Sequence, residues 1–140
     1  MRRSTTLLVG ILIAGTARLE AARGQSGRGY PTPAPFIAVR WKDATPEVKV
    51  KDAWYELLAI NEVSAKDLVT FCKEKEKKLW KKRFEEDLWE MMDRMGHKPG
   101  DKVTLKLRDL ANDKELVLKD VAMTEKNREA IREARTKEKR

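Results

Sequence analysis

The sequence predicts an α+β protein in which a small antiparallel sheet or partial barrel is closed by one long helix. Before residue 61, short stretches alternate apolar and charged side chains, as in residues 47–51, which is typical of half-buried strands. Residues 64–95 contain neither Gly nor Pro, and their apolar side chains recur every three or four positions, the spacing of a helix with one buried face. Alternation returns at residues 103–107, and 115–121 form a partner strand.

The first 22 residues have the composition of a secretory signal peptide. Two arginines precede an apolar run at residues 7–17, and small side chains follow it. Because this run is shorter than the roughly 20 apolar residues that a spanning helix needs, we expect cleavage near Ala22 and no stable membrane span afterwards. The protein would then be exported, either periplasmic or extracellular. An uncleaved signal anchor that holds the chain at the membrane is the alternative.

A flexible linker is predicted at residues 23–35, which are rich in Gly and Pro and lack an apolar period. The folded domain is then expected to cover residues 36–123. Its first three strands are predicted within residues 36–41, 47–51 and 54–60. The last of these ends in a continuous apolar stretch, which favours a strand that is buried on both faces.

The long helix is predicted to begin at Ser64, because the hydroxyl of an N-cap serine accepts a hydrogen bond from a free backbone N–H in the first turn. Gly96 suits the left-handed cap at its end. The apolar stripe is interrupted at Glu76, in the lysine-rich residues 73–78, where the helix either extends beyond its sheet or breaks into two. Three pairs of opposite charge four positions apart are expected to support its exposed face, namely Glu74 with Lys78, Lys81 with Glu85, and Lys82 with Glu86.

Residues 124–140 are predicted to form a basic C-terminal helix or tail. Thr124 is expected to cap a helix that continues to about Lys139. The apolar residues of this segment are Ala130, Ile131 and Ala134. We therefore expect a marginal helix that frays, rather than an element of the core.

The segment from Trp54 to Val121 resembles part of a PDZ domain, of the kind found in exported bacterial proteases. Leu58-Ala-Ile-Asn61 is similar to the strand and turn that precede the helix of that family. Pro99-Gly-Asp101 and the strand after it are similar to the segment that follows the helix. Glu62 stands where the family has Gly, the helix is longer, and the first strands are not preceded by a Gly-φ-Gly-φ loop, which in the family binds a peptide carboxylate.

The resemblance implies a PDZ-like fold with a peptide groove between the long helix and an edge strand, where a partner chain adds as an extra strand. Residues 35–39 are the expected edge. The residues expected to line the groove are Phe36, Ile37, Val39, Leu68, Val69 and Cys72. An ordinary place in the core is the other interpretation of the same six residues.

Catalytic and metal-binding residue types are scarce. His97 is the only histidine, and Ser26 and Ser64 are the only serines after the predicted signal peptide. At ~1.5 Å rise per residue, His97 would lie tens of ångströms from Cys72 along a straight helix, so a nucleophile–base pair is not expected. The lone Cys72 suits a buried small hydrophobe. We therefore expect a protein that is not an enzyme and has no cofactor or metal.

Together these observations favour an exported, non-catalytic protein-interaction domain, with an accessory role beside a protease as an extension. The alternative is a basic surface module that binds anionic cell-envelope polymer, lipid or nucleic acid, because the formal net charge is +8. Carboxylates precede and follow the basic residues 77–83 along the predicted helix, so positive charge is not segregated there, which argues against nucleic acid. The basic residues from Arg128 to Arg140 are the better candidates for an anionic partner.

Overall fold

The computed structural model describes residues 29–138, and the chain from Thr32 onward forms one compact unit. The predicted signal peptide and most of the predicted linker lie outside the described residues. The six strands are β1 (Ala38–Lys42), β2 (Thr45–Val50), β3 (Ala53–Ile60), β4 (Val63–Ser64), β5 (Lys102–Asp109) and β6 (Glu115–Ala122). The helices are α2 (Ala65–Glu76), the 3₁₀ turn η1 (Lys77–Leu79), α3 (Trp80–Glu86), α4 (Leu88–Arg94) and α5 (Glu125–Glu138).

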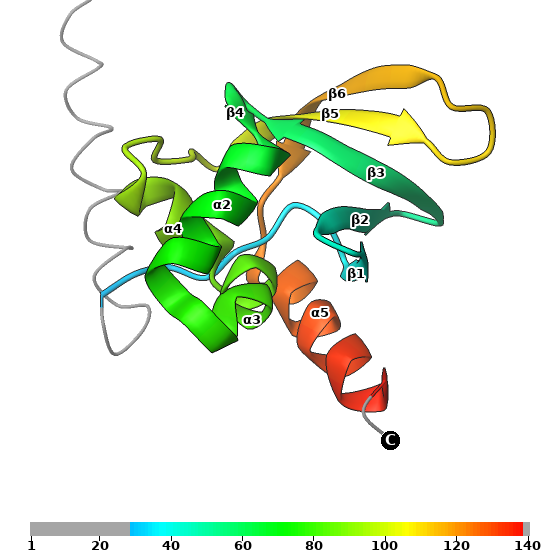
Figure 1. Cartoon of the computed structure of the whole chain (residues 1–140). Coiled ribbons are helices and arrows are strands. Elements are labelled where there is room, and N and C mark those ends of the chain that lie inside the picture. The colour runs from blue at the N-terminus through cyan, green and yellow to red at the C-terminus, as the bar shows by residue number, and fades with distance from the viewer. Residues whose placement is uncertain (1–28, 139–140) are drawn as a thin grey trace, which may run out of the picture. The chain divides into compact units, whose positions relative to one another are not determined.

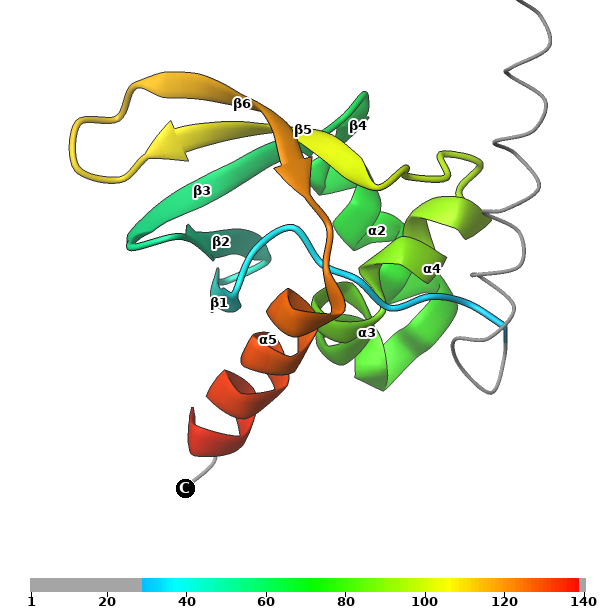
Figure 2. The same cartoon turned by 180° about the vertical axis from the view of Figure 1, so that it is seen from behind.

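The fold class is α+β, as predicted, with an open antiparallel sheet in the order β1-β2-β3-β5-β6. The short β4 pairs with the end of β3. Helices α2, α3 and α4 lie on one side of the sheet, while the β5–β6 hairpin extends beyond them (Figures 1 and 2). Within residues 29–138, no helix combines the length and apolar character needed to cross a bilayer.

The core lies between the sheet and these helices. Strand β5 alternates as predicted, with Val103, Leu105 and Leu107 buried. Asn61 makes the turn after β3 with a φ of 55°, a left-handed conformation that Asn tolerates, and its side-chain oxygen accepts a hydrogen bond from the N–H of Thr104. The largest fully buried side chains are Phe36, Phe84, Leu57, Ile60, Leu68, Leu88, Met91, Met92, Leu105, Leu107, Ile131 and Val48.

The predicted long helix is a helical run over residues 65–86 that changes direction within the lysine-rich stretch. Ser64 caps it as expected, accepting a hydrogen bond from the N–H of Asp67 at 3.0 Å. Of the two outcomes left open by the sequence, a break occurs: Lys77 ends α2 with φ 49° and ψ −119°. This backbone conformation is strained for a residue with a side chain. The break lets α3 and α4 pack against α2 (Figure 1).

The C-terminal helix differs from the fraying segment that the sequence suggests. Thr124 caps α5 as predicted, accepting a hydrogen bond from the N–H of Asn127 at 3.0 Å. However, Ile131 is fully buried, and α5 packs against α3 and β1. Tertiary packing thus supplies the stability that the helix lacks by itself.

The last residues of the predicted linker belong to the folded unit. Thr32 donates two hydrogen bonds, from its N–H and its hydroxyl, to the carboxylate of Glu125. Ala34 is buried and exchanges two backbone hydrogen bonds of 3.0 Å with Thr124. The compact unit, which begins at Thr32, therefore includes this segment, because it satisfies the backbone where α5 begins.

Candidate functional site

The clearest hollow between a helix and the sheet is a groove of about 430 Å³. Helix α2 forms one wall, the end of the β1–β2 turn and the start of β2 form the other, and part of β3 completes it. Its lining residues are Ala44, Thr45, Pro46, Glu56, Leu57, Leu58, Ser64, Ala65, Lys66, Val69, Thr70 and Lys73. We call this feature the α2 groove.

The helical period determines which residues of α2 line the groove. Lys66, Val69, Thr70 and Lys73 follow the i, i+3, i+4, i+7 spacing, so they share one side of the helix. Of these four, only Val69 is buried. The groove therefore has an apolar centre and a lysine near each end of its helical wall.

The α2 groove includes a stretch of β3 that has no neighbouring strand on one side. The pairing of β2 with β3 ends at Glu56, and β4 pairs with β3 only from Ala59 onward. Leu57 and Leu58 fall in the gap, where β3 also carries a bulge opposite β5. Leu57 is buried in this gap, whereas Leu58 is half-buried.

Of the six residues that the PDZ resemblance suggested for a groove, only Val69 lines the α2 groove. Leu68 and Cys72 are fully buried on the core side of α2, and Phe36 is also in the core. Ile37 and Val39 are half-buried, but they lie at β1, whereas α2 packs against β2, β3 and β4. The edge strand expected from residues 35–39 therefore does not border this groove.

The groove residues that the sequence interpretation missed flank the apolar stripe of the helix. The stripe identifies the core side, and the groove follows its polar margin at Lys66, Thr70 and Lys73. The helical period could have identified this margin. The opposite wall could not have been found in this way, because Ala44, Thr45 and Pro46 come from the β1–β2 turn and the start of β2, about 20 residues earlier in the sequence.

Cys72 and His97 lie in separate parts of the unit. Burial, followed by the negative charge of Glu76, raises the pKa of the Cys72 thiol to about 12, so the reactive thiolate is not formed at neutral pH. His97 follows α4 and lines a different, open hollow together with Asn61 and Thr104. Within residues 29–138, no group of three or more His, Cys, Asp or Glu side chains is arranged to hold a metal ion.

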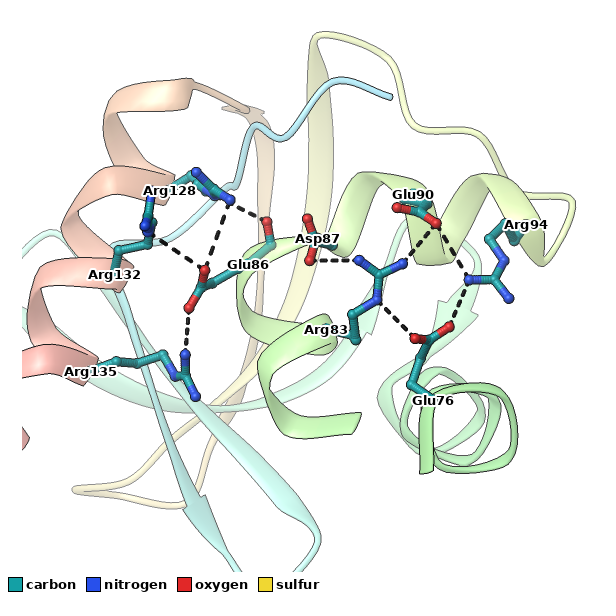
Figure 3. A network of polar contacts seen from close by, with 9 residues as sticks. All are labelled: Glu76, Arg83, Glu86, Asp87, Glu90, Arg94, Arg128, Arg132 and Arg135. Carbon is teal, nitrogen blue, oxygen red and sulfur yellow. Dashed lines mark hydrogen bonds and ion pairs between the residues drawn. The ribbon is translucent and has the colours of Figure 1, made fainter. Parts of the chain in front are cut away.

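A partly buried network of charged side chains connects α2, α3 and α4 (Figure 3). The Arg83 guanidinium contacts Glu76 at 3.1 Å, and Asp87 and Glu90 at 2.8 Å each. Arg94 donates a second hydrogen bond to Glu76 at 2.8 Å. This bond to Arg94 is the main cause that holds the pKa of Glu76 below its ordinary value, and Arg83 adds to it.

A second set of ion pairs connects α3 to the C-terminal helix. Arg128, Arg132 and Arg135 of α5 surround the buried carboxylate of Glu86 (Figure 3). The neighbouring Glu85 accepts a hydrogen bond of 2.7 Å from the indole of Trp41 and lies 3.0 Å from Arg135. Burial is nevertheless the largest influence on Glu85, and it raises the pKa of this carboxyl.

These contacts replace the ion pairs that the sequence spacing predicted. Glu85 and Glu86 turn toward α5 and Trp41, so Lys81 and Lys82 do not pair with them. Glu74 and Lys78 do not form an ion pair either within the part of the chain that the structure describes. The four-residue spacing does not predict the partners of Glu85 and Glu86, because arginines more than 40 residues away are better placed and less exposed.

Comparison of the chain with protein-family models, with curated proteins and with solved structures gives no match.

Proposed function

We propose that this chain is an exported, non-catalytic interaction module, PDZ-like in its use of a groove beside a helix, that binds a peptide segment of a protein partner. The observation that carries the proposal is the α2 groove, in which a stretch of β3 without a strand partner lies beside α2. Recognition of an extended segment between a strand and a helix uses this kind of arrangement. An accessory role beside a protease is the natural extension of this proposal.

The lining of the groove indicates the chemistry of the peptide. Lys66 and Lys73 are exposed and lie seven residues apart on α2, which corresponds to roughly 10 Å along the helix. Three extended residues span about the same distance. An acidic side chain or a C-terminal carboxylate at one lysine, with an apolar side chain near Val69 and Pro46, fits this lining.

Binding in the α2 groove differs from the usual addition of a whole strand. Strand β2 is already paired on both sides, with β1 and with β3. Leu57 is buried, so Leu58 is the position of this gap that a peptide backbone can reach, and each backbone hydrogen bond contributes about 1 kcal/mol. We therefore expect weak binding that depends mainly on side chains.

The test is a two-dimensional amide NMR titration of the full chain with a pool of short peptides that carry free C-terminal carboxylates. The expected result is a set of shifts confined to the groove, at Thr45, Leu58 and Thr70, that is reduced but not abolished when salt is raised, because salt screens the lysine contact and not the apolar contacts. An amidated pool of the same peptides shows whether a terminal carboxylate contributes. No shift at these three positions with either pool would contradict the proposal.

A matched pair of variants separates the groove from the rest of α2. Thr70 and Lys75 are both exposed on α2, but only Thr70 lines the groove. Thr70→Trp fills the groove and should weaken peptide binding at least tenfold, whereas Lys75→Trp should leave binding within twofold of the unmodified chain. Equal effects of the two substitutions would show that the peptide binds elsewhere.

A further inference from the structure

A second surface, separate from the lining of the groove except at Lys73, is formed by the turn between α2 and α3. The exposed side chains of η1 and of the first turn of α3 are Lys77, Lys78, Leu79, Lys81 and Lys82. The half-buried Trp80 lies among them, and Lys73 and Lys81 both approach its ring, at 4.8 and 5.6 Å from the centroid. We call this surface the lysine face. It is formed by Leu79, Trp80 and five lysines, namely Lys73, Lys77, Lys78, Lys81 and Lys82.

The tertiary structure separates charges that are mixed in the sequence. Of the acidic residues between positions 73 and 90, those that pair with arginines are turned inward. They are Glu76, Glu85, Glu86, Asp87 and Glu90. Glu74 is the one exposed carboxylate of that stretch. Apart from Glu74, the lysines therefore remain on the outside without the carboxylates that neighbour them in the sequence.

The five lysines of this face are not neutralised within the described part of the chain. Among the lysines of the described residues, Lys106 pairs with a carboxylate, that of Glu115, and both lie on the distant β5–β6 hairpin. In contrast, three C-terminal arginines that looked available in the sequence, Arg128, Arg132 and Arg135, are engaged with Glu86. A cluster of lysines without carboxylate partners thus lies on η1, on the start of α3 and at Lys73 of α2.

The apolar side chains on the lysine face distinguish between two kinds of anionic partner. Leu79 is 56% exposed, and it lies at the turn with lysines on both sides in the sequence. The rings of Trp41, Trp80 and Phe84 pack edge to face, with centroids 5.0 and 5.1 Å apart, and lysines lie over Trp41 and Trp80. The aromatic rings of the lysine face are thus already engaged with one another and with lysines, which does not favour the base stacking by which single-stranded nucleic acid is bound.

We propose that the lysine face docks on a membrane surface that carries anionic lipids. Lysines at such a surface are attracted by its negative potential, and an exposed leucine between them enters the boundary between headgroups and acyl chains. The interaction weakens as salt rises, because its electrostatic part is screened. Docking in this way leaves the β5–β6 hairpin away from the membrane contact.

The direct test places an environment-sensitive fluorophore at the centre of the face in the full chain. Leu79→Cys supplies the attachment site, and the buried Cys72 does not compete, because its thiol is inaccessible and its pKa is raised. The probes are phosphatidylcholine vesicles with or without about 30% phosphatidylglycerol. The expected result is a blue shift with the anionic vesicles alone, reversed at about 0.5 M salt.

The matched control carries the same label at Leu110→Cys. Leu110 is also an exposed leucine, at 42%, but it lies in the turn of the β5–β6 hairpin. It reports any contact that the rest of the chain makes with the vesicles, and it should not shift. No shift at position 79, or equal shifts at positions 79 and 110, would overturn the proposal.

Charge reversal provides a second, independent test. The variant Lys78→Glu/Lys81→Glu/Lys82→Glu should bind anionic vesicles more than tenfold more weakly, whereas Lys102→Glu/Lys119→Glu/Lys126→Glu should stay within twofold of the unmodified chain. All six lysines are exposed, so both variants are expected to fold. Equal loss in both variants would overturn the proposal. So would tighter binding to a single-stranded oligonucleotide than to vesicles of equal negative charge, which would assign the face to nucleic acid.

Discussion

Arg83 lies at the centre of the contacts between α2, α3 and α4. The sequence places it in a run of basic residues with Lys81 and Lys82, yet it is buried and those lysines are exposed. Its guanidinium donates hydrogen bonds on three sides, to the carboxylates of Glu76, Asp87 and Glu90. A planar group with several fixed donors suits this position, whereas a lysine would offer a single charged point.

Replacing Arg83 by Met should lower the free energy of unfolding by about 3 kcal/mol, because it leaves three partly buried carboxylates without their common partner. Urea unfolding followed by circular dichroism measures the change. The control is Lys82→Met, one position away and exposed, which should change stability by no more than about 0.5 kcal/mol. A loss under 1 kcal/mol for Arg83→Met would mean that the network contributes little.

At the scale of the element, α5 shows how a helix with few apolar residues becomes part of the core. Ile131 is fully buried, and the arginines one turn before and after it reach Glu86. One apolar anchor and several ion pairs therefore fix the helix on α3. The backbone bridge between Ala34 and Thr124 also fixes the point at which α5 begins.

The substitution Ile131→Ala should therefore destabilise the protein by about 2–4 kcal/mol, the range for removing a large apolar side chain from a core. Glu133→Ala is the matched control, since Glu133 is exposed on the same helix, and a change under about 0.5 kcal/mol is expected. Thermal unfolding of the two variants measures the difference. Near-identical stabilities would mean that α5 is not docked in solution.

Across the whole molecule, charge is distributed by depth. Buried and half-buried carboxylates pair with arginines inside the helical layer, while lysines remain outside. Two carboxyls of this layer have opposite responses to pH. Hydrogen bonds from Arg94 and Arg83 lower the pKa of Glu76, whereas burial raises the pKa of Glu85.

The lowered pKa of Glu76 predicts a loss of stability in acid. Its folded-state pKa lies below the ordinary 4.5, so its contribution is complete above 4.5 and is lost as the pH falls through the folded-state value. Glu76→Gln should be less stable at pH 7 and should show a smaller further loss on acidification. Urea midpoints from pH 7 to pH 3 test this, with the exposed Glu74→Gln as control. Parallel curves for Glu76→Gln and the unmodified chain would contradict the prediction.

The contribution of buried Glu85 to stability changes with pH in the opposite direction. Because its pKa is raised, its ionised form disfavours the folded state above that pKa, and protonation relieves this effect as the pH falls. The acid loss of the intact protein is therefore the net result of opposing groups. Measurement of Glu76→Gln alone isolates the stabilising part of this balance.

The elements that sequence analysis identified are those that depend on nearby residues. Alternation predicted the strands, and the side chains of Ser64 and Thr124 marked the starts of α2 and α5, because each cap bonds a backbone N–H three positions away. The groove was predicted less well: Val69 is the one residue of the six that lines it. A buried stripe and a groove margin differ by one position on a helix, and only packing distinguishes them.

By itself, the sequence determined the α+β class, the order of the elements and the helix caps, because these follow from side-chain periods and from hydrogen bonds over a few residues. The tertiary structure alone decided which charges are buried. Glu85 and Glu86 find their partners on α5, and Arg83 turns inward between helices that the break at Lys77 brings together. The strength of an ion pair depends on distance and burial in space, and neither follows from separation along the chain.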